Sequence, residues 1–104
     1  MIHWEDNNIA YLKAETLIQN KEIFFSTLTE REGFDLILDC KNYLFNLSEF
    51  EYIALHQQKE GNCFVLILSS EQSHNLPSEW IAVPTKREAL DFISFEQMQR
   101  DLGF

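Results

Sequence analysis

The chain has 104 residues, the length of one domain, and we expect residues 1–104 to fold as a single domain. A formal net charge of −9 repels phosphate backbones and anionic lipid surfaces, which argues against nucleic acid and membranes as direct ligands. The amino-terminal residues lack a basic region followed by an apolar core, and no apolar run approaches the ~20 residues that span a bilayer. We therefore expect a cytoplasmic protein.

The first third of the chain predicts a hairpin followed by a helix. Ile2–Glu5 and Ile9–Ala14 are compatible with strands, and Asp6-Asn7-Asn8 suits the turn between them because Asp and Asn tolerate positive φ. Apolar side chains at helical spacing predict a helix from Thr16 to about Glu32. Its inward face would carry Leu17, Phe24 and Leu28.

The middle of the chain predicts a strand, a helix and a second strand. Phe34–Asp39 is the first strand, and the helix would run over Ser48–Glu60 and end at Gly61. Ser48 would be its N-cap, because Ser48-x-x-Glu51 matches a capping box. Cys63–Leu68 is apolar without alternation, so both faces of this strand should be buried, as in a parallel sheet covered by helices.

The last third predicts a loop, a short strand and helical structure. Ser69–Glu79 is polar and would be an exposed loop, Trp80–Val83 would be a strand, and Thr85–Ile93 a helix. Ser94–Leu102 either continues that helix or begins another. Capping patterns recur at Thr16-x-x-Gln19, Thr85-x-x-Glu88 and Ser94-x-x-Gln97. The alternation of strands and helices predicts an α/β fold with a mixed, mainly parallel sheet of four or five strands and helices packed against it.

The sequence carries no recognisable enzyme motif. His3, His56 and His74 lie far apart without metal-ligand spacing, and there is no glycine-rich phosphate loop or nucleophile elbow. Cys40 and Cys63 form no CxxC motif, and we expect free thiols that lie near each other if their strands pair. We expect no catalysis, no cofactor and no metal.

The order of the elements, the strand Leu36-Ile37-Leu38-Asp39 and a helix beginning at Ser48 together resemble the STAS domain, the fold of anti-sigma-factor antagonists. In that family a strand ending in Asp leads through a short loop to a serine or threonine at a helix N-terminus. A partner kinase phosphorylates that residue, which releases the partner. Asp39 matches the strand-end Asp, and Ser48 falls at or beside the phosphorylated position, so the resemblance implies a phospho-switch at Ser48.

The carboxyl-terminal segment VPTKREALDFISFEQMQRDLGF resembles the ending of small STAS-like proteins that are sometimes labelled ribonuclease Z. Three scattered histidines cannot supply the metal centre of that nuclease, so the label would indicate a nuclease partner rather than nuclease activity.

The resemblance implies a regulatory, protein-binding domain. The partner would be an anti-sigma factor, a kinase-like regulator, or a ribonuclease-type enzyme. One alternative is a module that binds a nucleotide or a lipid near the same helix start, and another is a structural domain without a ligand. An apolar pocket near Ser48 would favour the ligand module, and an exposed patch without a pocket would favour a protein partner. The residues expected to contact a protein partner are Lys41, Asn42, Tyr43, Asn46, Ser48, Glu49 and Tyr52.

Three further residues have two interpretations each. Trp80 would anchor the last strand or form an interface contact. Leu102 and Phe104 would pack back on the sheet or dock as an exposed peptide into another protein.

Overall fold

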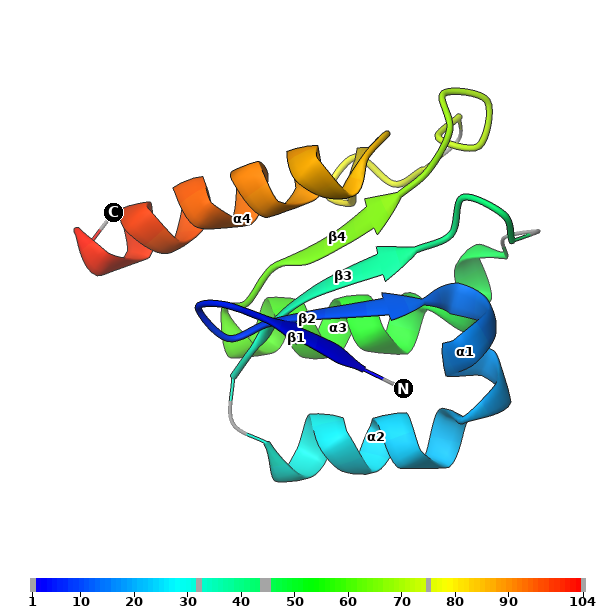
Figure 1. Cartoon of the computed structure of the whole chain (residues 1–104), viewed down its shortest axis with the longest axis horizontal. Coiled ribbons are helices and arrows are strands. Elements are labelled where there is room, and N and C mark those ends of the chain that lie inside the picture. Colours follow the sequence, from blue (N-terminus) through cyan, green and yellow to red (C-terminus); the bar gives the residue numbers. More distant parts are fainter. Residues whose placement is uncertain (1, 32, 44–45, 75, 104) are drawn as a thin grey trace.

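The computed structural model describes residues 2–31, 33–43, 46–74 and 76–103. They form an α/β fold around one five-stranded sheet in the order β1-β2-β3-β4-β5 (Figure 1). β1 pairs antiparallel with β2, and the other neighbouring strands pair parallel, so the predicted mixed, mainly parallel sheet is confirmed. The strands are β1 His3–Glu5, β2 Ile9–Lys13, β3 Asp35–Asp39, β4 Phe64–Ile67 and β5 Ile81–Val83. The helices are α1 Ala14–Gln19, α2 Lys21–Glu30, the 3-10 turn η1 Leu47–Glu49, α3 Glu51–Glu60 and α4 Lys86–Asp101.

Helices lie on both faces of the sheet. α1, α2 and α3 lie on one side and α4 lies on the other (Figure 1). The parallel strands succeed one another in space as they do in the chain, so right-handed crossovers place their connecting helices on the same face. α4 follows the last strand and covers the opposite face. None of the helices in the described parts of the chain combines the length and the apolar character needed to cross a membrane.

Strands β3 and β4 are buried on both faces, as the apolar run predicted. Leu36, Leu38 and Leu66 face α1–α3, in a core that includes the buried side chains of Phe24 and Phe50. The alternate positions face α4. This second cluster consists of Ile9, Ile37, Val65, Ile67, Ala89 and Ile93.

The predicted hairpin is confirmed, and the two asparagines explain it. Asn7 has φ 65° and Asn8 has φ 61°, the left-handed region that Asn tolerates better than most residues. Glu5 pairs with Ile9 across the turn.

The predicted helix from Thr16 to Glu32 is broken in two. α1 begins at Ala14 after Lys13, which makes no side-chain cap, so the predicted capping box at Thr16 is wrong. The break is at Asn20, which has φ −134° and ψ 41°. The Asn20 side chain donates to the Thr16 carbonyl at 2.8 Å and so satisfies one of the free carbonyls at the end of α1. α2 ends at Glu30, and Glu32 lies outside the described residues.

The carboxyl-terminal helix is continuous. Thr85 caps it as predicted, because its Oγ1 accepts from the Glu88 backbone N–H at 3.1 Å. Ser94 lies within α4, so a separate helix capped by Ser94 is wrong. Leu102 is 65% exposed, so it does not pack on the sheet, and Phe104 lies outside the described residues. Trp80 is half-buried and meets Phe64 edge to face, with 5.7 Å between ring centroids, as expected of an anchor for β5.

Candidate functional site

The carboxyl-terminal end of β3 leads into the segment predicted to contact a partner. Asp39 holds this end of the strand, because its Oδ2 accepts from the Tyr11 hydroxyl at 2.5 Å and its Oδ1 accepts from the Lys41 backbone N–H at 3.1 Å. Burial and the neighbouring Asp39 carboxylate raise the pKa of Tyr11. Asp39 therefore orders the start of the loop, and both carboxylate oxygens are occupied.

A residue that the sequence did not indicate holds the loop from the other side. Gln72, in the polar loop after β4, donates through Nε2 to the carbonyls of Cys40 at 3.0 Å and Tyr43 at 3.2 Å. Its own side-chain carbonyl accepts from the Ser69 backbone N–H at 2.8 Å. The only sequence signal was a single Gln in a polar loop, and its partners lie 29 and 32 residues earlier.

Tyr43 connects the loop to the turn before α3. Its hydroxyl donates to Glu49 Oε2 at 2.9 Å, and its ring lies 6.3 Å from the ring of Phe50. Burial, followed by the Glu49 carboxylate, raises the pKa of Tyr43, so the phenol stays protonated as the donor at neutral pH. Phe50 is fully buried, which fixes the turn to the core.

Ser48 does not cap a helix, so that prediction is wrong. The residue lies within η1, and α3 begins at Glu51 with Phe50 at its N-cap position. Asn46 is the residue that caps η1, since its Oδ1 accepts from both the Ser48 backbone N–H at 3.1 Å and the Ser48 hydroxyl at 3.0 Å. Ser48 is exposed, and its hydroxyl lies beside an amide oxygen rather than at the start of the long helix.

Replacing Ser48 by alanine should therefore change stability little. The exposed hydroxyl bond to Asn46 is worth about 0.5 kcal/mol or less by the scale of neutral hydrogen bonds, because water replaces it. Thr85→Ala is the matched control, since Thr85 is a true N-cap and its loss should cost about 1 kcal/mol. Urea unfolding of the two variants measures both values. A loss for Ser48→Ala as large as that for Thr85→Ala would contradict the structure.

The predicted contact residues form one continuous segment with different exposures. Tyr43 and Glu49 are half-buried and bonded to each other, whereas the others are exposed, with Tyr52 at 54%. Tyr52 meets Phe25 of α2 edge to face, with 5.2 Å between ring centroids. Leu55, one turn further along α3, is 66% exposed. We refer to Phe25, Tyr52 and Leu55 as the aromatic patch.

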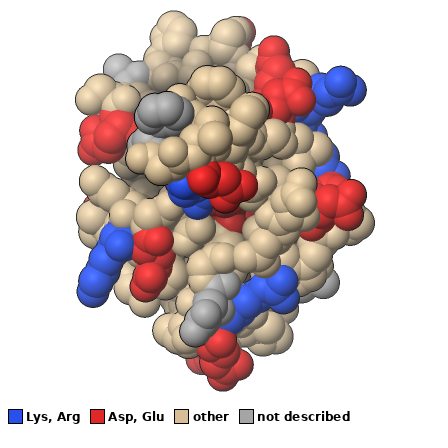
Figure 2. Space-filling model, turned by 90° about the vertical axis from the view of Figure 1, so that its left-hand side faces the viewer, with Lys and Arg blue, Asp and Glu red and all other residues tan. Residues whose placement is uncertain are grey.

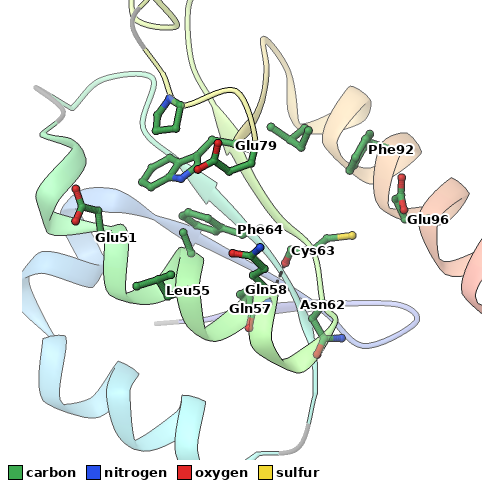
Figure 3. A pocket seen from close by; sticks show the side chains of 14 residues that line it. Glu51, Leu55, Gln57, Gln58, Asn62, Cys63, Phe64, Glu79, Phe92 and Glu96 are labelled. Carbon is green, nitrogen blue, oxygen red and sulfur yellow. Dashed lines mark hydrogen bonds between the residues drawn. The ribbon is translucent and has the colours of Figure 1, made fainter.

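A cavity of about 490 Å³ opens beside α3 (Figure 3). It lies between α3, the start of β5 and α4, and Ser48 is not among the residues that line it. The lining residue nearest to Ser48 in sequence is Glu51. This cavity is therefore not the apolar pocket at Ser48 that would have favoured a ligand module.

A buried charge cluster lies at the opposite end of the sheet, where the central strand β3 begins. Asp35 is 2% exposed, and its Oδ2 accepts from Arg100 at 2.7 Å and from Gln97 at 2.7 Å, both on α4. Its Oδ1 accepts from the Cys63 backbone N–H at 2.7 Å. Burial would raise the pKa of Asp35, but the hydrogen bonds from Arg100, Cys63 and Gln97 outweigh it and lower the pKa overall. Both carboxylate oxygens of Asp35 accept hydrogen bonds, and those from Gln97 and Arg100 hold α4 against the sheet.

The described residues form no broad patch of one sign on the surface around that end of the sheet. Figure 2 shows acidic and basic side chains interspersed among neutral ones on the side where the end of α4 and the β1–β2 turn lie. A phosphate-binding face would instead gather several cations.

The two cysteines lie at opposite ends of the sheet, so the expectation that they are neighbours is wrong. β3 and β4 are parallel, and Cys40 follows the end of one strand whereas Cys63 precedes the start of the other. Both thiols are free. Burial, together with Asp39 near Cys40 and Asp35 near Cys63, raises the pKa of each to about 12, so neither is a reactive thiolate.

Within the described residues, no three His, Cys, Asp or Glu side chains come together as metal ligands would. His56 lies 3.3 Å from the side chain of its neighbour Gln57, and His3 lies 3.5 Å from Glu5. Lys41 meets Asp39 through its backbone N–H, at 3.1 Å from Asp39 Oδ1.

Comparison with known proteins gives no identification: no protein-family model, curated protein or solved structure matches this chain.

Proposed function

We propose that this chain is a non-catalytic, regulatory protein-binding domain of the STAS type that contacts its partner through the predicted contact residues between Lys41 and Tyr52 and through the aromatic patch. The aromatic patch is the observation that carries the proposal. Phe25 of α2 and Tyr52 of α3 meet edge to face at the surface, and Leu55 is exposed one turn further along α3. The loop before α3 is fixed by Asp39 and Gln72. Exposed aromatic residues on an ordered scaffold are typical of interface hot spots.

The proposed relationship to STAS domains is supported by the position of the loop after β3. β3 ends in Asp39, a short loop follows, and η1 and α3 come next, which is the succession that the resemblance implies. The sheet is mainly parallel with neighbours in chain order, and three helices share one face.

The partner that this surface fits is a protein with an apolar site bordered by basic side chains. Glu49 and Glu51 come just before Tyr52 in the chain, and the whole chain has a net charge of −9. Opposite charge on a partner would speed association and orient it. An anti-sigma factor or kinase-like regulator is the partner class we propose, with a ribonuclease-type enzyme as the second class.

Ser48 is the proposed switch of this interface. A phosphate there would add about −1.5 to −2 charges at neutral pH, next to Glu49 and close to the aromatic patch. It would also replace the hydroxyl donor that Asn46 accepts. Both effects disfavour the present arrangement of the turn and would weaken binding to a partner.

A pull-down from native lysate tests this proposal. The wild type should retain a specific protein that Tyr52→Ser and Ser48→Glu lose. Ile23→Ser and Ser94→Glu are the matched controls. Ile23 is 58% exposed and lies two residues before Phe25, so it points to a different side of α2. Ser94 is exposed on α4, on the opposite face of the sheet. The controls should bind as the wild type does.

Two outcomes would count against the proposal. If the protein retained by the wild type is retained equally by Tyr52→Ser, the aromatic patch is not the interface. If Tyr52→Ser loses the protein but Ser48→Glu retains it, the aromatic patch remains the interface and the switch at Ser48 is rejected.

A small-ligand module is the second candidate, and the cavity beside α3 is the observation that favours it. Its volume of about 490 Å³ is within the range of small-molecule sites. Its acidic border disfavours nucleotides and phospholipids, because their phosphates would be repelled.

A further inference from the structure

The cavity beside α3 exists because the last strand is short. β5 pairs with β4 only along Val65 to Ile67, so no strand covers the edge of β4 at Phe64. α3 and α4 lie on opposite faces of the sheet and form the two side walls of the space that remains (Figure 3). The connection before β5 supplies the remaining wall through Pro77, Glu79 and Trp80.

The interior of the cavity is apolar and aromatic. Phe64 comes from β4, and Trp80 meets it edge to face before β5 begins. Phe92 points toward the cavity from α4, and Ala54 and Ile81 complete the apolar lining with Leu55. Such a lining suits a flat apolar group, which would stack against aromatic rings and displace water.

The border of the cavity is acidic on three sides. Glu51 lies on α3, Glu79 lies just before β5, and Glu96 lies on α4 (Figure 3). Neither lysine nor arginine is among the lining residues, and no Lys or Arg of the described residues forms an ion pair with these three carboxylates. The remaining polar lining, Gln57, Gln58 and Asn62, is neutral.

We propose that this cavity binds a small organic cation with a flat aromatic body. The aromatic body lies on Phe64, Trp80 and Phe92, and the cationic group lies at the acidic border, where the nearest of the Glu51, Glu79 and Glu96 carboxylates attract it. The indole of Trp80 adds attraction for the same charge through its π face. This site adjoins the proposed protein interface, with which it shares Leu55 and Glu51.

Three probes with the same indole body and different charge test the proposal. Tryptamine is a cation, tryptophol is neutral and indolepropionate is an anion. Titration of the full chain, followed by amide NMR spectra and calorimetry, should show tryptamine binding at least about tenfold more tightly than indolepropionate, with tryptophol between them. The shifted amides should be those of Trp80, Ile81, Phe92 and Glu96.

Variants locate the binding and separate charge from fold. The triple variant Glu51→Gln, Glu79→Gln and Glu96→Gln should weaken tryptamine about tenfold and leave tryptophol unchanged. A charge-matched control carries Glu30→Gln, Glu71→Gln and Asp91→Asn, which lie outside the cavity lining, and should bind tryptamine as the wild type does. Ala54→Phe fills part of the cavity and should weaken all three probes.

The proposal is overturned if indolepropionate binds as tightly as tryptamine, or if tryptamine shifts no amide of the cavity. It is also overturned if the charge-matched control loses as much affinity as the triple variant, because general surface charge would then explain the binding. Unfolding curves of each variant show whether a loss arises from misfolding, and tryptophol binding to the triple variant confirms an intact cavity.

Discussion

Replacing Phe50 by alanine is expected to lower the free energy of unfolding by about 3–5 kcal/mol, a large part of the total stability of a domain of this size. Phe50 is fully buried and is among the largest buried side chains of the protein. It also stands at the junction where η1 ends and α3 begins, so the alanine variant would leave a void beneath that junction. Urea unfolding followed by circular dichroism measures the effect.

Two matched variants separate burial from residue type. Phe95→Ala removes the same side chain from α4 at a position that is 55% exposed, and it should cost less than about 1 kcal/mol. Phe50→Leu keeps most of the apolar volume and should fall between the two alanine variants. A loss for Phe50→Ala no larger than that for Phe95→Ala would contradict the packing described here.

Replacing Phe50 should also weaken partner binding at the proposed interface. Tyr43 packs its ring on Phe50 and bonds to Glu49, so the loop and the turn depend on the same buried phenylalanine. The aromatic patch begins two residues later, at Tyr52. Phe50→Leu, which should remain folded, is the variant in which partner binding can be compared with stability.

Local signals explain the elements that the sequence predicted well. Asn7 and Asn8 tolerate the positive φ that the hairpin needs, and Thr85 places a hydroxyl where α4 begins. The unbroken apolar run around Val65 predicts a strand covered on both sides, and helices do cover both sides. Each of these features is determined within a few neighbouring residues.

The incorrect predictions concern features that depend on burial and on side-chain hydrogen bonds, which residue type and spacing alone do not reveal. Ser48 has the residue type and spacing of a helix cap, but burial of Phe50 shifts the start of α3 to Glu51. Asn20 breaks the first helix because its side chain reaches the carbonyl of Thr16, which the apolar periodicity does not reveal.

The Asp35 cluster could not be predicted because most of its partners are distant in sequence. Its partners Gln97 and Arg100 follow 62 and 65 residues later, on a helix from the other end of the chain. The one available signal was a carboxylate directly before the apolar run of β3, where it must be buried with the strand. A buried charge needs partners, but the sequence does not say which residues supply them.

Replacing Asp35 by alanine is the second change with a large expected effect. It would leave the Cys63 backbone N–H, Gln97 and Arg100 without their shared acceptor, at a cost of about 2–3 kcal/mol. Arg100, whose side chain is 34% exposed, can turn to water, whereas the Cys63 amide is held by the sheet. α4 should detach more readily than the rest, so its amides should lose protection from hydrogen exchange first.

At acid pH the wild type should no longer have a higher free energy of unfolding than Asp35→Asn. That variant keeps the shape of the side chain and removes its charge. The folded state lowers the pKa of Asp35, so its stabilisation is fully present above the unfolded value of about 3.9. As pH falls below that value toward the lower folded pKa, the unfolded state binds a proton first and the stabilisation is lost. The two unfolding free energies should therefore converge below about pH 4.

The control for this pH dependence is Asp91→Asn. Asp91 also pairs with an arginine, but its side chain is 69% exposed and lies 3.7 Å from Arg87, so solvent screens the pair. Its substitution should change stability little at any pH. If Asp35→Asn behaved like Asp91→Asn at neutral pH, the buried cluster would contribute nothing to holding α4 on the sheet. The attachment of α4 would then rest on its apolar contacts, such as those of Ala89 and Ile93, and on its other polar contacts, such as that between Lys86 and Glu5.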